Sequence, residues 1–118
     1  MNWVLVFIGG GIGSLMRYAV GRLFTFKGVS FPWATFISNT LSCLLFVVVL
    51  IFLFRLPKNE WLQPFFLVGI CGGFSTFSSF SYENFQLFQN GNYFLLFTNI
   101  LVSVIIGFGS FFILKLIA

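Results

Sequence analysis

The stretch Gly69–Glu83, which reads GICGGFSTFSSFSYE, decides the fold of this protein. It lies within an otherwise apolar segment from about residue 62 to residue 88, yet it holds three glycines and five serine or threonine hydroxyls. Inside a bilayer every backbone polar group needs a partner within the protein. A Gly-Gly pair followed by hydroxyls therefore predicts a helix that is broken where it lines something polar. We expect this break, at Gly72 and Gly73, to form the ion-handling part of a small channel.

The composition of the whole chain indicates its class. Of 118 residues, 59% are hydrophobic and only 7% are charged, which excludes an ordinary soluble domain. A membrane helix needs roughly 20 apolar residues, so four of them use most of the chain. We expect one transmembrane domain over residues 1–118, with spans at about 2–26, 33–54, 62–88 and 93–117. A bundle this small has little interior of its own, which predicts that the protein forms oligomers.

Two function classes are disfavoured by the polar residues of the chain. Histidine and aspartate are absent, and they are the usual general bases and metal ligands, so we do not expect an enzyme. The six basic residues are scattered instead of clustered on one face, so we do not expect nucleic-acid binding. Cys43 and Cys71 fall within apolar segments, where a small buried thiol is the expected role.

The basic residues are divided evenly between the two sides of the predicted membrane domain. With four spans, both termini and the second loop lie on the same side. That side carries Arg55, Lys58 and Lys115, and the opposite side carries Arg17, Arg22 and Lys27. Because orientation follows the asymmetry of lysine and arginine, this balance favours no single orientation. We expect a chain that inserts both ways and pairs antiparallel with itself, or one that pairs with a partner of fixed opposite orientation.

The first span has a face of small residues. Gly9 and Gly13 are four residues apart, the spacing that lets two helix backbones approach closely. A dinucleotide-binding loop is the weaker interpretation of these glycines, because neither a strand before them nor a βα pattern after them is present. Arg17 follows on the same face. It either extends to the lipid headgroups or serves the interior of the protein, and the sequence leaves both possibilities open.

Polar residues also interrupt the second and fourth spans. The first turns of the second span carry Thr35, Ser38, Asn39, Thr40 and Ser42. Asn39 is costly in a membrane unless it is hydrogen-bonded, so it either joins two helices or donates to a passing ligand. In the fourth span Asn99, Ser103 and Gly107 recur every four residues, which predicts a one-sided stripe that faces protein.

The polar stretch has the chemistry of a weak anion site. Phe77 and Phe80 share one helical face, and the edges of their rings are positive, although simple packing explains them equally well. Serine, threonine and asparagine add hydrogen-bond donors. Such donors offset the dehydration of a small anion without trapping it, as conduction requires. Carbonyls freed at Gly72 and Gly73 are suited to a structural monovalent cation held between two chains.

With these residues identified, the sequence resembles the fluoride channels of the Fluc, or CrcB, family over essentially its whole length. The residues that carry the resemblance are Gly10, Gly13, Arg17 and Tyr18; Pro32, Trp33, Thr35 and Asn39; and the motif GICGGFSTFSSF at residues 69–80. The sequence departs from the family pattern at Ala34 and Ser42, where glycine is usual, at Ser75, where threonine is common, and at Asn99, where tyrosine often occurs. The first three replace one small residue by another.

The resemblance implies an all-α membrane protein with four spans, the third one broken. It further implies a dual-topology antiparallel dimer with two pores, in a bacterial cell membrane, that exports cytoplasmic fluoride passively. The implied fluoride-pore residues are Phe77, Phe80, Asn39, Ser78, Thr76, Ser103, Arg17 and Glu83. The implied ligands of a central Na⁺ ion are the backbone carbonyls of Gly72 and Ser75.

Two other functions are compatible with parts of the pattern. A small multidrug transporter is also a short four-span protein that inserts both ways, but it needs a carboxylate within the membrane. The first span has none, and Glu83 lies towards the end of its span. A non-conducting subunit of a heterodimeric channel is the second alternative. The presence of Phe77, Phe80 and Asn39 argues against it.

Overall fold

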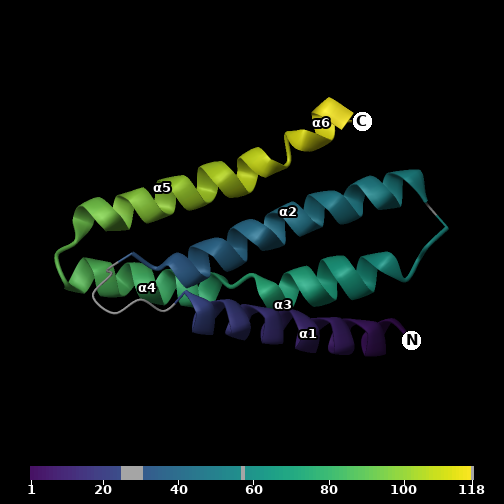
Figure 1. Ribbon diagram of the computed structural model, residues 1–118, viewed down its shortest axis with the longest axis horizontal. Coiled ribbons are helices and arrows are strands. Elements are labelled where there is room, and N and C mark those ends of the chain that lie inside the picture. Colours follow the sequence, from purple (N-terminus) through teal and green to yellow (C-terminus); the bar gives the residue numbers. More distant parts are fainter. Residues whose placement is uncertain (25–30, 57, 118) are drawn as a thin grey trace.

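The computed structural model describes residues 1–24, 31–56 and 58–117, and every regular element in these ranges is helical (Figure 1). The elements are α1 (Asn2–Leu23), α2 (Trp33–Arg55), η1 (Gln63–Cys71), α3 (Gly72–Phe74), α4 (Phe77–Gln89), α5 (Tyr93–Ser110) and α6 (Ile113–Ile117). Four segments are long and apolar enough to cross a membrane, namely Asn2–Leu23, Trp33–Arg55, Gln63–Gln89 and Tyr93–Ile117. This confirms the predicted all-α fold with four spans and a broken third span. The expected end of the first span at Phe26, and Lys27, lie outside the described residues.

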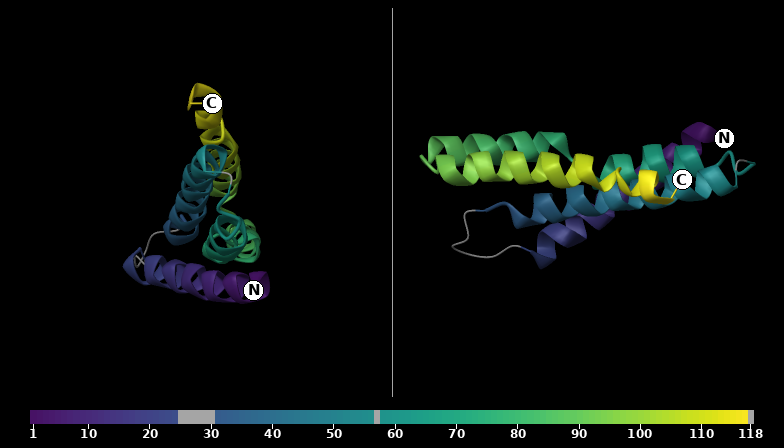
Figure 2. Two further views of the ribbon diagram at one scale, coloured as in Figure 1. Left: turned by 90° about the vertical axis from the view of Figure 1, so that its right-hand side faces the viewer. Right: turned by 90° about the horizontal axis from the view of Figure 1, so that it is seen from above.

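The four spans run alternately up and down, so both termini lie at the same end of the molecule as the connection from α2 to η1 (Figure 1). The end-on view shows α1 at one edge and α5 with α6 at the other, with α2 and the third span between them (Figure 2). The bundle is flat, with extents of 51 × 32 × 20 Å, so it encloses few side chains. Among the residues that the structure describes, seven apolar side chains are buried: Val47, Val49, Leu67, Ile70, Cys71, Phe74 and Leu87.

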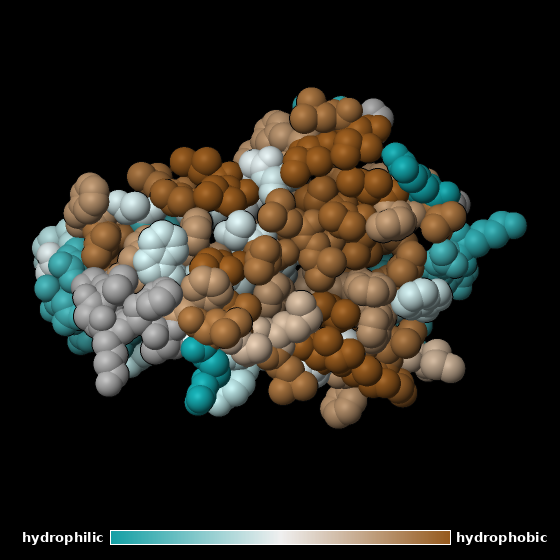
Figure 3. Space-filling view, viewed as in Figure 1, coloured by the Kyte–Doolittle hydropathy of each residue, from teal (hydrophilic) through white to brown (hydrophobic). Residues whose placement is uncertain are grey.

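The outer surface is correspondingly apolar. Brown hydrophobic side chains cover most of the face in Figure 3, and polar groups gather towards the two ends and in a band near the middle. An exposed apolar surface of this extent must be covered by lipid or by another protein chain.

The seam between α1 and the third span is built from glycines. Gly9 and Gly13 of α1 are buried, as their spacing predicted. Their neighbours across the seam are Gly69 and Gly73, which are also four residues apart. A Cβ atom on Gly69 would lie 2.9 Å from the Cα of Gly9, and one on Gly13 would lie 2.9 Å from the amide nitrogen of Phe74. The two backbones therefore touch, and no side chain fits between them.

The break in the third span lies at Ser75 and Thr76, three residues later than the predicted break at Gly72 and Gly73. Gly72 keeps helical dihedral angles (φ −64°, ψ −36°), and Gly73 lies within α3. Ser75 (ψ 156°) and Thr76 (ψ 117°) are extended, and α4 begins at Phe77. The prediction of a break at the Gly-Gly pair was wrong because Gly73 serves the packing against α1, whereas side-chain hydrogen bonds hold the extended residues that follow.

Candidate functional site

The extended backbone at the break is held by one side chain of α2. The Oδ1 atom of Asn39 accepts a hydrogen bond of 2.8 Å from the Thr76 amide, and its Nδ2 atom donates one of 3.3 Å to the Thr76 carbonyl. This reciprocal pair replaces the bonds that a continued helix would have made, so the break leaves neither group of Thr76 unpaired. In this state of the chain Asn39 joins two helices, which was the first of its two interpretations.

Hydroxyl groups form hydrogen bonds with the backbone on both sides of the break. The Cys71 carbonyl accepts from Ser42 Oγ (2.9 Å), from Ser75 Oγ (2.8 Å) and from the Ser75 amide (3.1 Å). Thr76 caps α4, because its Oγ1 atom accepts from the Ser79 amide at 3.2 Å. The helix therefore restarts with an ordered N-terminus, and amide groups there favour negative charge.

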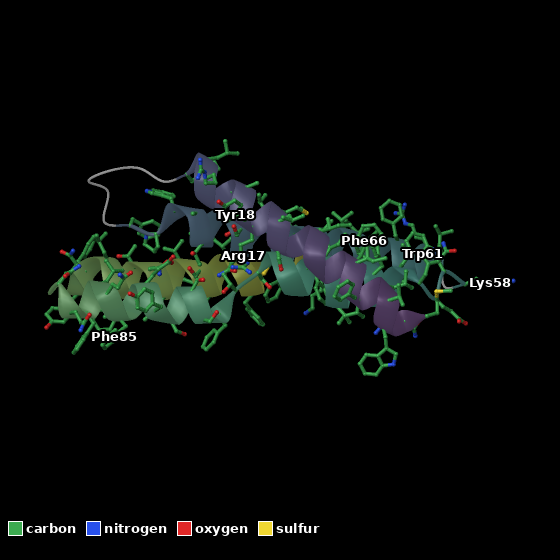
Figure 4. All side chains as sticks on the ribbon, turned by 90° about the horizontal axis from the view of Figure 1, so that it is seen from below. Arg17, Tyr18, Lys58, Trp61, Phe66 and Phe85 are labelled. Carbon is green, nitrogen blue, oxygen red and sulfur yellow. The ribbon has the colours of Figure 1, made fainter. Side chains whose placement is uncertain are left out.

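Arg17 serves the interior of the protein. Its Nε atom donates a hydrogen bond of 3.1 Å to the Gly73 carbonyl, 56 positions away in the chain. Figure 4 shows the side chain extending from α1 towards the middle of the third span. This contact decides between the two roles that the sequence left open. It also brings a positive charge close to the N-terminus of α4.

A polar cavity of about 230 Å³ adjoins the break. It is lined by Arg17, Gly21, Ala34, Thr35, Ser38, Thr76, Ser79 and Glu83. Thr35 Oγ1 donates to Glu83 Oε1 at 2.7 Å, whereas Glu83 Oε2 and Ser38 Oγ are buried without a hydrogen-bond partner among the described residues. A liquid water occupies about 30 Å³, so the cavity has room for several waters or a small hydrated ion. Its two unpaired polar atoms favour such an occupant.

Three of the predicted pore residues, Arg17, Thr76 and Glu83, thus meet around one cavity, and Asn39 bonds to Thr76. The sequence did not single out Ser38, which is only 1% exposed. A signal was present, because Thr35, Ser38 and Ser42 occur at helical spacing and all three are buried.

The two predicted pore phenylalanines lie outside this cavity. Their ring centroids are 6.2 Å apart with an angle of 39° between the rings, so Phe77 and Phe80 do share a helix face. Phe77 is 80% exposed, Ser78 is also exposed, and Phe80 is half-buried. The chain therefore presents these side chains on its surface and does not enclose them.

Ser103 is bonded elsewhere, in a buried polar chain between α4 and α5. Asn99 Nδ2 donates to Asn84 Oδ1 at 2.7 Å, and Ser103 Oγ donates to Asn99 Oδ1 at 3.3 Å. The predicted polar stripe on the fourth span does face protein, since Gly107 also adjoins Cys43. The partner, Asn84, was not foreseen. Nothing in its spacing distinguishes it from a polar residue near the end of a span.

The two predicted cation ligands line a second cavity, of about 160 Å³, on another side of the break. Gly72 and Ser75 lie there beside Ser42 and Cys71. The carbonyls at the end of α3 have no partner in the next turn, because the helix stops. In the described part of the chain no three His, Cys, Asp or Glu side chains gather to bind a metal.

Comparisons with known proteins identify the family of the chain. The model of the family described as "CrcB-like protein, Camphor Resistance (CrcB)" matches residues 4–114. The fluoride-specific ion channel FluC of Azobacteroides pseudotrichonymphae is 51% identical over 108 residues, which cover 87% of this chain and 84% of the relative. The FluC proteins of Phocaeicola vulgatus (88% and 87% covered) and Leptospira interrogans (92% and 87% covered) are each 41% identical. The chain is a multi-pass membrane protein with bacterial relatives, and it belongs to the CrcB family.

Proposed function

We propose that this protein is a fluoride-specific ion channel, not an enzyme, through which cytoplasmic fluoride leaves the cell passively. The observation that carries the proposal is the break in the third span. In a chain of mean hydropathy +1.08, Asn39 holds two residues extended, and hydroxyls, an arginine and a helix N-terminus gather around them. Packing alone does not require such an arrangement at membrane depth.

The site suits an anion that must bind and leave again. Hydrogen bonds to a charged species are worth about 1.5–3 kcal/mol each, so Ser38, Thr76 and Ser79 together offset part of the dehydration of fluoride. The N-terminus of α4 and the charge of Arg17 add attraction. The ring edges of Phe77 and Phe80 then offer a second, weaker site further along, which permits release.

The assembly that we propose is an antiparallel homodimer with two pores. It is supported by the 80% exposure of Phe77 and by the exposure of Ser78 and Gly72, because a second copy would cover these groups and enclose a path beside them. The equal number of basic residues on the two sides supports insertion in both orientations. A paralogous subunit of opposite orientation would cover the same surface.

A structural Na⁺ ion at the centre of that dimer is part of the proposal. One protomer offers only the carbonyls of Gly72 and Ser75, which are too few to replace a hydration shell. Two copies related by a two-fold axis would double the set. The ion would then be held by both chains, stabilising the break without being transported.

Fluoride efflux from liposomes that contain the purified protein tests the function. We expect wild-type protein to release fluoride and not chloride. Phe80→Ile should lower the fluoride rate about tenfold, which corresponds to a barrier raised by about 1.4 kcal/mol. Phe97→Ile, at an exposed position of α5, serves as the control and should match wild type. Absence of wild-type flux, as in a non-conducting subunit, would overturn the proposal.

Thiol labelling tests the orientation of the chains. A Lys58→Cys variant places an exposed thiol at the end that carries both termini. A membrane-impermeant reagent added outside intact vesicles should label about half of the molecules if the chain inserts both ways, and the rest should react only after lysis. Labelling that is complete, or absent, before lysis would exclude the homodimer.

A further inference from the structure

An apolar groove of about 380 Å³ lies between the second half of α2 and the start of the third span. Val49 is buried at 5% exposure, whereas Val48 and Phe52 on its walls are about half-exposed at 46% and 53%. Asn59 and Trp61 are the polar and amphipathic residues of its lining. Figure 4 shows Trp61 and Phe66 together near the end of the molecule beyond which Lys58 extends, and their ring centroids are 6.0 Å apart.

The length of the groove corresponds to one leaflet of a bilayer. Its lining residues on α2 and at the C-cap of that helix run from Leu45 to Leu56, which is about 16 Å at 1.5 Å per residue. Half of a hydrocarbon core of about 30 Å is about 15 Å. The apolar part therefore extends from the boundary to about the middle of the membrane, and Trp61 marks the boundary as an interfacial aromatic residue.

The boundary end of the groove is preformed and carries net positive charge. Backbone hydrogen bonds from Leu56 to Phe52 (2.8 Å), from Asn59 to Leu56 (3.2 Å) and from Leu62 to Asn59 (3.2 Å) hold the turn. Three charged side chains are exposed there: Arg55, Lys58 and Glu60. Two are basic and one is acidic, so the turn has one net positive charge. No ion pair joins these three residues in the described structure.

We propose that this groove binds one anionic glycerophospholipid. One acyl chain lies along Val48 and Phe52, and the phosphate is attracted by Lys58 and Arg55. The amide of Asn59 and the indole N–H of Trp61 face the glycerol ester level, where hydrogen-bond donors are useful. An apolar path of one leaflet that ends at a turn with one net positive charge fits an anionic lipid better than a protein segment, because such a lipid joins an acyl chain to a phosphate.

A second copy of the chain is the less suitable occupant. The copy proposed above covers the side of the third span that exposes Gly72 and Phe77. On α2, the residues beside that side are Ser42, Cys43 and Phe46, and none of them lines the groove. The lipid proposal thus uses a different face. It does not rest on fluoride conduction.

Quenching of Trp61 fluorescence by a brominated lipid tests the proposal. Trp3→Phe and Trp33→Phe leave Trp61 as the sole tryptophan. The protein is reconstituted in phosphatidylcholine with increasing fractions of phosphatidylglycerol, and one lipid at a time carries brominated acyl chains. One net charge near the mouth predicts about a fivefold preference for phosphatidylglycerol. Equal quenching by both lipids would overturn the proposal, and so would a Trp61 that neither lipid quenches, which is the result expected if protein covers the groove.

Two variants with matched controls locate the effect. Arg55→Gln with Lys58→Gln should abolish the preference, whereas Arg22→Gln, exposed at the opposite end, should leave it unchanged. Val48→Phe should fill the groove and lower quenching by either lipid at its site, and Val104→Phe, 58% exposed on α5, should not. A preference that survives Arg55→Gln with Lys58→Gln would contradict the site, and so would unchanged quenching in Val48→Phe. Fluoride efflux of the same samples is recorded separately, so failure of conduction and failure of lipid binding are distinguishable.

Discussion

The third span is held on two sides by contacts of opposite chemistry. Against α1 it packs glycine on glycine, with Gly9 and Gly13 opposite Gly69 and Gly73, and one hydrogen bond from Arg17 at the end of the seam. Against α2 it is held by side-chain hydrogen bonds from Asn39 and Ser42. Glycine in this chain brings helices together, whereas polar side chains of a neighbouring helix open the backbone. The first contact is expected to govern stability and the second to govern the ion path.

The glycine seam should be the most sensitive to added volume. Gly13→Ala introduces a Cβ that collides with the Ile70 carbonyl, which is backbone and cannot rotate away. We expect the free energy of unfolding to fall by about 3 kcal/mol, the upper end of the usual range for overpacking. The apparent midpoint of thermal unfolding in detergent, followed by the folded fraction on size-exclusion chromatography, measures it.

The matched control is Gly11→Ala, two positions away on α1. A Cβ there meets nothing within 4 Å, and alanine is favoured over glycine in helices by about 1 kcal/mol. The midpoint should therefore stay or rise. Equal losses in the two variants would show that the seam is not the reason for the glycine at residue 13.

The polar contact should respond most to loss of Asn39. Asn39→Leu removes both hydrogen bonds to Thr76 and leaves two backbone groups unpaired. Each unpaired group should lower the free energy of unfolding by about 1–3 kcal/mol. Amide exchange of a peptide that covers residues 72–80, measured by mass spectrometry, should become faster. Thr40→Val, on the same helix turn but without a hydrogen bond to the break in the described structure, should exchange like wild type. Acceleration in both variants would indicate a general loosening of α2.

A single hydroxyl should have the smallest effect. Ser42→Ala removes one buried hydrogen bond to the Cys71 carbonyl, which still accepts from Ser75. The free energy of unfolding should fall by about 1 kcal/mol. In Thr98→Ala the lost bond is a local one to the Phe94 carbonyl on an exposed part of α5, so the thermal midpoint should hardly change. Similar shifts of the midpoint for Ser42→Ala and Thr98→Ala would show that a bond to the break stabilises the protein no more than a local bond does.

Much of this organisation could be predicted from the sequence. Hydropathy predicts four spans because each helix must satisfy its own backbone in lipid, and the spacing of Gly9 and Gly13 predicts a close seam. The polar run after Gly73 predicts a break. The predicted position was wrong by three residues, because a Gly-Gly pair has the same local signature whether it unwinds a helix or packs against another one.

Other features depend on contacts between distant residues. The sequence leaves the role of Arg17 open because its partner, the Gly73 carbonyl, lies 56 positions away. Likewise, the partner of Asn99 is Asn84, 15 positions earlier. Ser38 was recoverable from helical spacing alone, since Thr35, Ser38 and Ser42 form one buried polar face. The groove beside Trp61 could not be predicted, because its shape depends on the turn that joins α2 to the third span.

We propose that fluoride passes where Asn39 holds the third span open. Asn39→Asp keeps the acceptor for the Thr76 amide but sets an oxygen, in place of the Nδ2 donor, against the Thr76 carbonyl. Fluoride efflux from liposomes, normalised to folded protein, is the direct measurement. We expect the efflux rate to fall at least about tenfold, which corresponds to a barrier raised by about 1.4 kcal/mol. The variant should elute from size-exclusion chromatography like wild type. Wild-type efflux from folded Asn39→Asp protein would contradict it.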